Sequence, residues 1–191
     1  MENIGLGWDG VYKLTADATE TLNVRGTGLF NAGANDLLNL KTVVVTETAG
    51  LRLHAGVADT VTSVNTAGTT GAVTVSIKGG QATYAGGAGV DTVTLSAATA
   101  LTKAIDLGAG DDTLIFGVSV TGSTATLSGG AGTGTLSMTV TNADALDAAP
   151  QTFYTGFERL TLNNAWGGAD AAPGGAAEVM TLNLVNLGFT N

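Results

Sequence analysis

The most informative part of this sequence is residues 86–94, Gly86-Gly87-Ala88-Gly89-Val90-Asp91-Thr92-Val93-Thr94. It matches the nonapeptide repeat G-G-x-G-x-D-x-U-x, in which U is apolar, at every defined position. Its first part is a glycine-rich turn that ends at an aspartate, and its last residues alternate apolar and polar side chains as a strand does. We therefore expect a tight turn that leads directly into a β-strand.

Two further copies of this pattern follow at regular intervals. Residues 107–115, LGAGDDTLI, begin 21 residues later and fit at all but the first position. Residues 129–137, GGAGTGTLS, begin 22 residues further on and keep the glycines, but Gly134 stands where the aspartate belongs. One match carries little weight in a chain with 29 glycines. Repetition at a nearly constant spacing, with each turn entering a strand, indicates stacked turns.

A short strand that begins with threonine and alternates apolar and other residues recurs along the chain, both at the end of these turns and elsewhere. Its steps are close to one or two units of roughly 21 to 25 residues, which suits one coil of a β-solenoid because each coil buries its apolar residues against its neighbours. The segments are residues 21–24, 42–45, 92–95, 113–116, 135–138 and 181–184, with 60–64 and 159–162 in the gaps.

We predict an all-β protein, a right-handed parallel β-solenoid with coils of about 20–22 residues, folded as a single domain over residues 1–191. The clearest repeats lie at residues 79–140. Residues 142–151 are predicted to form a short helix or a loop. Residues 163–178, which contain Pro173-Gly174-Gly175, are predicted to form an inserted loop.

Composition and charge narrow the classes of partner. Only 12% of the residues are charged, against about 25% in an average globular domain, yet 44% are apolar, which argues against a disordered chain. The net charge of −9 and the seven scattered Lys and Arg residues argue against nucleic acid as a partner, and the negative charge favours binding of cations. There is no cysteine, and therefore no disulfide or thiolate metal site. No apolar run approaches the roughly 20 residues that span a bilayer, and the first residues lack the features of a signal peptide.

The turn pattern supplies ligands for calcium. Glycines let the backbone adopt left-handed dihedral angles, so that several carbonyl oxygens converge, and the aspartate adds a carboxylate. Calcium takes six to eight oxygen ligands, so one turn does not fill its shell and two stacked turns do. The alternative is that each aspartate only accepts hydrogen bonds from turn amides. The candidate ligand positions are Gly87, Gly89, Asp91, Gly108, Gly110, Asp112, Gly130 and Gly132, the last two contributing carbonyl groups alone.

Three fainter copies of the turn lie near the start of the chain. Residues 4–12 fit the pattern except at the first position and place Asp9 at the ligand position. The segments around Asp36 and Asp59 retain mainly the aspartate and the strand entry. We include all three aspartates as candidate calcium ligands, with stabilisation of a turn as the favoured role of Asp36 and Asp59.

These residues resemble the RTX (repeats-in-toxin) calcium-binding β-roll family, and most nearly bacterial surface-layer (S-layer) proteins of RTX type. Besides the turns at 86–95 and 108–116, the strand entry Gly156-Phe157-Glu158-Arg159-Leu160 carries the likeness, which covers about residues 79–165. The resemblance implies that Asp91 and Asp112 bind calcium, and that the chain is a fragment of a larger protein exported by type I secretion. A spacing of 21 to 22 residues differs from the 18 of a regular roll, so we expect no calcium at the opposite corner.

We expect a structural role: a calcium-dependent secreted β-solenoid that folds outside the cell and associates with itself into a lattice or oligomer of a surface layer. Cell-surface polysaccharide is a further candidate partner. We expect no enzyme activity, because His54 is the sole histidine and adjacent Asp111 and Asp112 diverge on a turn. The alternatives are the repeat region of an RTX adhesin or biofilm matrix protein, and an accessory module of a secreted polysaccharide-acting enzyme.

Overall fold

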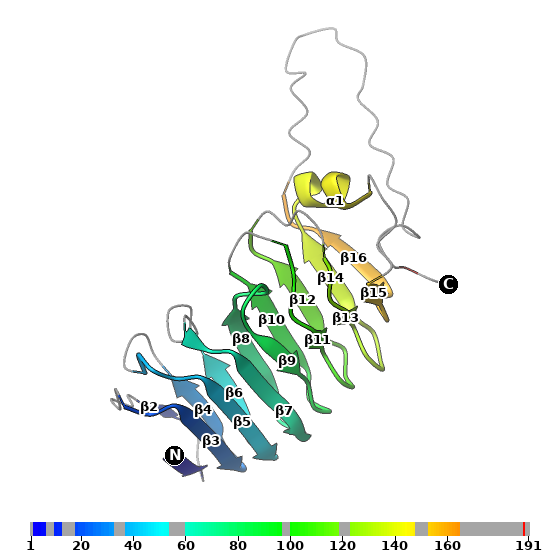
Figure 1. Ribbon diagram of the computed structural model, residues 1–191. Helices are drawn as coiled ribbons and strands as arrows, with labels where there is room; N and C mark the ends of the chain where they lie inside the picture. Colours follow the sequence, from blue (N-terminus) through cyan, green and yellow to red (C-terminus); the bar gives the residue numbers. More distant parts are fainter. Residues whose placement is uncertain are drawn as a thin grey trace, which may run out of the picture.

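The computed structural model describes residues 2–6, 10–12, 18–32, 37–53, 60–96, 100–118, 123–147, 153–164 and 189. Within them the chain winds as a parallel β-solenoid in which each coil gives one strand to each of two facing sheets (Figure 1). We call these the odd and even sheets after their strand numbers. The prediction of an all-β parallel solenoid is confirmed.

All strand pairs in both sheets are parallel. In spatial order, the odd sheet contains β1 (Glu2–Leu6), β3 (Thr21–Gly26), β5 (Thr42–Glu47), β7 (Ser63–Thr69), β9 (Thr83–Ala85), β11 (Ile105–Asp106), β13 (Leu127–Ser128) and β15 (Tyr154–Thr155). The even sheet contains β2 (Gly10–Tyr12), β4 (Leu29–Ala32), β6 (Gly50–Leu53), β8 (Val73–Ile77), β10 (Asp91–Leu95), β12 (Thr113–Phe116), β14 (Thr135–Met138) and β16 (Arg159–Leu162).

The core is built from columns of like residues that stack from coil to coil. Alternate residues of a strand point inward, and the register places Val93 between Val75 and Leu114, with Leu136 next in line. All four side chains are buried. Each fully buried side chain of this size stabilises the fold by about 1.5–3 kcal/mol. The core, which also contains large side chains such as Phe30, Phe116 and Phe157, therefore depends on the register between successive coils.

The recurring threonine strands belong to both sheets rather than to one series. The segments that begin at Thr21 and Thr42 lie in the odd sheet, whereas those that begin at Thr92, Thr113 and Thr135 lie in the even sheet. Strands such as β6 (GLRL) and β9 (TYA), which do not carry the full pattern, fill the remaining positions of the two sheets.

Coil length varies more than the sequence pattern indicates. Residues at equivalent positions of successive coils are 18 apart between Val73 and Asp91, 21 between Asp91 and Asp112, and 24 between Gly134 and Glu158. The extra residues leave the sheets unchanged because the connecting segments take them up. One insertion contains helix α1 (Val140–Asp147), which lies over the end of β14 (Figure 1). A helix was one of two predictions for residues 142–151; most of the loop predicted at 163–178 lies outside the described residues.

Candidate metal centre

One inward column of the even sheet changes from apolar to acidic along the solenoid. In the earlier coils it holds Phe30, Leu51 and Val73, which are in register and fully buried. The next position is Asp91, which pairs with Val73. The register of the following strands then places Asp112, Gly134 and Glu158 at this position. We call this series, from Asp91 to Glu158, the acidic column.

Each carboxylate of the acidic column reaches back by one coil to accept a backbone hydrogen bond. The Val73 N–H donates to Asp91 Oδ1 at 3.1 Å, the Asp91 N–H to Asp112 Oδ1 at 2.7 Å, and the Gly134 N–H to Glu158 Oε2 at 2.7 Å. These amides lie at the start of a strand in the preceding coil. The carboxylates therefore tie successive turns together. Asp91 also accepts a hydrogen bond from the Gly87 amide of its own turn, which is the local role considered in the sequence.

Asp91 is satisfied on both oxygens by donors of the protein. Its Oδ2 accepts a hydrogen bond of 2.7 Å from the Tyr84 hydroxyl, whose oxygen lies 3.1 Å from the hydroxyl of Thr66. Tyr84 belongs to β9 of the odd sheet, so its side chain crosses the interior to meet the turn. All three residues are almost inaccessible to solvent, at 1%, 2% and 0% exposed for Asp91, Tyr84 and Thr66.

Asp112 is satisfied on one oxygen only. Its side chain is 0% exposed, and Oδ1 accepts the Asp91 N–H, but Oδ2 is buried without a hydrogen-bond partner. A buried carboxylate oxygen without a donor is costly. It favours either a proton or a cation at this position.

The glycines of the turns permit the close stacking that surrounds these carboxylates. Gly87 O accepts the Ala109 N–H at 2.7 Å, and Gly108 O accepts the Ala131 N–H at 2.7 Å. Gly108 has a φ of +87°, and a Cβ atom there would lie 2.4 Å from Gly87 O. A side chain would therefore separate the turns as well as strain the backbone. The stacked turns direct carbonyl oxygens along the solenoid axis, toward the next turn.

Burial and like charge raise the pKa values of both aspartates. Desolvation is the largest cause for Asp91, whose pKa rises to about 6 against the hydrogen bond from Tyr84, and the charge of Asp112 adds to the increase. Desolvation also raises the pKa of Asp112, with a smaller contribution from the charge of Asp111. The charged groups that raise these two pKa values are carboxylates: Asp112 for Asp91, and Asp111 for Asp112.

The donor set fits calcium if backbone oxygens supply most of the ligands. No group of three or more His, Asp or Glu side chains converges on one point among the described residues. The site instead offers one unpartnered buried carboxylate oxygen on Asp112, beside stacked glycine turns rich in carbonyl groups. Hard oxygen donors of this mixed kind are those that calcium prefers. Asp112 Oδ2 and the turn carbonyls would hold the ion, which would neutralise the buried negative charge.

The structure brings together the turns chosen from the sequence and adds residues that the sequence did not indicate. Gly87, Gly89, Gly108, Gly110, Gly130 and Gly132 lie in three stacked turns, with Asp91 and Asp112 at their ends. Asp9, Asp36 and Asp59 lie outside the described residues.

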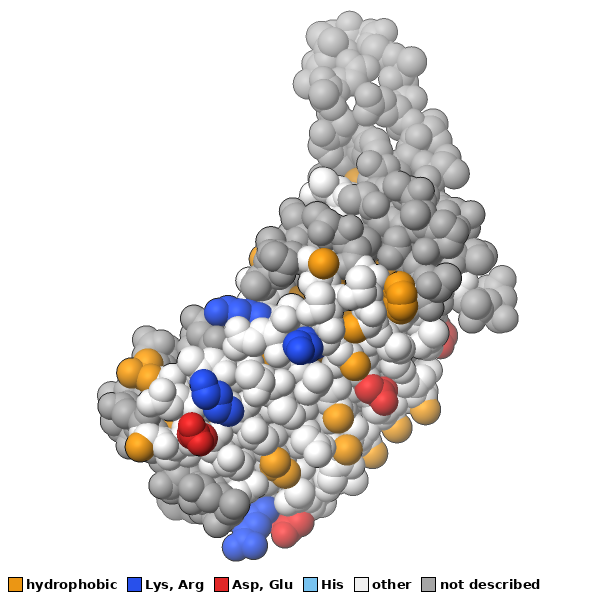
Figure 2. Space-filling view, in the orientation of Figure 1, with side chains coloured by type: hydrophobic (Ala, Val, Ile, Leu, Met, Phe, Trp, Pro, Cys, Tyr) orange, Lys and Arg blue, Asp and Glu red, His pale blue; other side chains and the backbone are white. Residues whose placement is uncertain are grey.

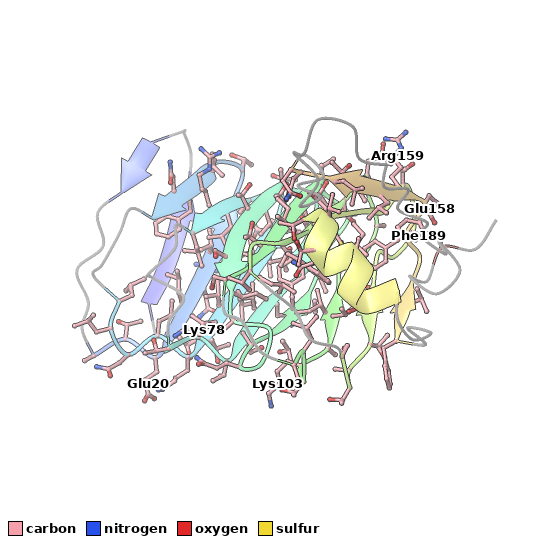
Figure 3. All side chains as sticks on the ribbon, turned by 90° about the horizontal axis from the view of Figure 1, so that it is seen from above. Glu20, Lys78, Lys103, Glu158, Arg159 and Phe189 are labelled. Carbon is pink, nitrogen blue, oxygen red and sulfur yellow. The ribbon has the colours of Figure 1, made fainter. Side chains whose placement is uncertain are left out.

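Two residues of the site were not assigned a role from the sequence. Glu158 was part of a strand entry, and its place in the acidic column follows from the register alone; it lies at the α1 end of the solenoid (Figure 3). Tyr84 was not among the residues considered in the sequence. In the sequence, Tyr84 is distinguished only by its position seven residues before Asp91. That spacing predicts a contact only when the path of the coil is known.

Comparison with known proteins returns no matching family model, no matching curated protein and no matching solved structure. No helix in the described part of the chain is long and apolar enough to cross a membrane. On the face shown in Figure 2, the charged side chains of the described residues are scattered rather than gathered into a patch. Charge therefore marks no second site on that face, and the acidic column remains the site with the clearest chemistry.

The raised pKa values predict that the metal-free protein becomes less stable as pH increases. A group with a native pKa above its unfolded value binds its proton more tightly when folded, so the free energy of unfolding falls as pH rises from about 4 through 6. In metal-free buffer we expect the Tm to be higher at pH 5 than at pH 7.5, with about 1 kcal/mol from Asp91, or roughly 3 °C. Thermal scans of the wild type and Asp91→Asn measure this. The substitution is expected to reduce the pH dependence, and an equal dependence in both proteins would contradict the assignment.

Proposed function

We propose that this chain is a calcium-dependent structural β-solenoid, a piece of a bacterial surface-layer protein that folds and assembles outside the cell. One observation carries the calcium assignment: Asp112 Oδ2 is buried without a hydrogen-bond partner, between stacked turns whose glycines leave room for carbonyl oxygens. The turn motif, with its resemblance to RTX surface-layer proteins, supports the cellular role.

The proposed dependence on calcium follows from the charge of the acidic column. Folding places Asp91 and Asp112 one coil apart in the core, and each raises the cost of ionising its neighbours. A divalent cation beside Asp112 offsets this cost, so the coils form more readily when calcium is present. Extracellular calcium modules bind at about 10⁻⁴ to 10⁻³ M. On this proposal the chain remains unfolded inside the cell, passes through a type I secretion system and folds in external calcium.

The proposed assembly follows from the geometry of an open solenoid. The sheets of the described region end in β1 and β2 at one end and in β15 and β16 at the other. Terminal strands pair readily with further strands, which suits end-to-end contact with neighbouring domains or copies. The net charge of −9 keeps chains apart, and bound calcium reduces that repulsion.

The calcium assignment predicts a stabilisation that depends on Asp112. At about 5 mM calcium and an affinity in the range above, we expect a gain of about 2 kcal/mol, or a rise in Tm of roughly 6 °C. Magnesium at the same concentration should have little effect, because it requires tighter octahedral geometry and holds its water more strongly. Asp112→Asn should abolish most of the calcium response, whereas Glu20→Gln, which removes an exposed charge far from the turns, should retain it.

Differential scanning calorimetry of the three proteins in metal-free buffer, calcium and magnesium checks this prediction. A calcium-induced rise of the same size in Asp112→Asn and Glu20→Gln would exclude Asp112 as a ligand. An identical Tm of the wild type in metal-free buffer and in calcium would contradict calcium binding altogether.

The surface-layer role predicts association that requires calcium. Static light scattering over a range of protein concentrations should detect oligomers or sheets in millimolar calcium and dispersed chains in chelator. A protein that remains monomeric at high concentration in calcium would contradict the lattice role. It would favour an adhesin repeat, which uses the same scaffold without forming a lattice of its own.

A further inference from the structure

We infer that the residue seven positions before each aspartate of the acidic column decides whether that turn takes a cation, and that Tyr84 replaces the cation at Asp91. The inference rests on the proposed calcium binding for the identity of its ligand. It concerns a different question: which of the two matching turns requires the ion. The sequence motif assigns Asp91 and Asp112 the same role, whereas their surroundings in the solenoid differ.

The difference arises at one position of the odd sheet. Tyr84 and Ile105 are register partners in adjacent strands, β9 and β11, and both are buried. Each lies the same distance in sequence before the aspartate of its own coil. Tyr84 donates its hydroxyl proton to Asp91 Oδ2 at 2.7 Å. The side chain of Ile105 has no polar atom, and in the coil of Ile105 the Asp112 Oδ2 atom has no hydrogen-bond partner.

The Tyr84 hydroxyl offers Asp91 what a cation would offer, a positive pole directed at one carboxylate oxygen. Thr66 fixes the tyrosine from the preceding coil, since its hydroxyl lies within hydrogen-bond distance of both Tyr84 Oη and Ala85 O. The Val73 N–H occupies the other carboxylate oxygen. Both carboxylate oxygens of Asp91 are therefore satisfied without metal.

Val73 is the last apolar residue of the inward column before the first carboxylate, Asp91. The inward column is apolar up to Val73 and acidic from Asp91 onward. Asp91 is thus the first carboxylate of the column, with an apolar coil on one side and a glycine turn on the other. The turn at this boundary has a glycine-rich turn with an aspartate on one side only, with which it could share an ion. At this end of the series, the Tyr84 hydroxyl donates the hydrogen bond to Asp91 instead.

The test compares Tyr84→Phe with Tyr154→Phe. Tyr154 is a matched control because it lies in the same inward column of the odd sheet and is equally buried, but its hydroxyl has no hydrogen-bond partner. Both substitutions remove one hydroxyl and preserve the ring. Calcium stoichiometry is measured by isothermal titration calorimetry at pH 8, where carboxylates are ionised, and Tm is measured in chelator and in calcium.

We expect Tyr84→Phe to bind about one more calcium ion per chain than the wild type, and to be less stable in chelator by roughly 5 °C because Asp91 Oδ2 loses its donor. Calcium should restore that loss. Tyr154→Phe should keep the stoichiometry and the calcium-induced change in Tm of the wild type. An unchanged stoichiometry and calcium response in Tyr84→Phe would overturn the inference. The response of the wild type separately tests the proposed function, so the two failures are distinguishable.

Discussion

In the glycine-rich region, the structure depends on carboxylates of one coil that accept hydrogen bonds from amides at the start of strands in the preceding coil. Asp91, Asp112 and Glu158 each accept such an amide from the preceding coil. At Asp91 and Asp112 this interaction places negative charge in the core, where it is poorly solvated, whereas Glu158 is exposed to solvent. Each of the two buried aspartates therefore needs a compensating donor or cation. The hydroxyl of Tyr84 serves at Asp91, and we propose calcium at Asp112.

The same constraint explains why glycine is so frequent in these turns. A carboxylate reaches back one coil only if consecutive turns are in contact, and contact leaves no space for side chains at positions such as Gly108 and Gly130. Gly134 occupies the position of an aspartate in the column, and its amide donates a hydrogen bond to the Glu158 carboxylate of the next coil. The close stacking of the turns thus brings the buried carboxylates into place, and the proposed ion binding depends on the same stacking.

The sequence predicted the class of fold and the turns well, because both depend on local patterns. The alternation in 113–116 and the glycines of 86–89 report directly on strand and turn. The assignment of strands to two sheets was not predictable from the threonine pattern, since β6 and β9 carry few of the expected residues. The roles of Tyr84 and Glu158 depend on which residues meet across coils. Because the coil length varies between 18 and 24 residues, no fixed sequence period predicts which residues are in register.

We propose that two aspartates at the same motif position have different partners: a tyrosine for Asp91 and calcium for Asp112. Carbon-13 NMR of the aspartate side-chain carboxyl groups during a calcium titration at pH 8 distinguishes the two sites. We predict that the Asp112 carboxyl resonance shifts and saturates with calcium, while that of Asp91 moves much less. A large shift of Asp91 equal to that of Asp112, or no response of Asp112 at all, would contradict the account.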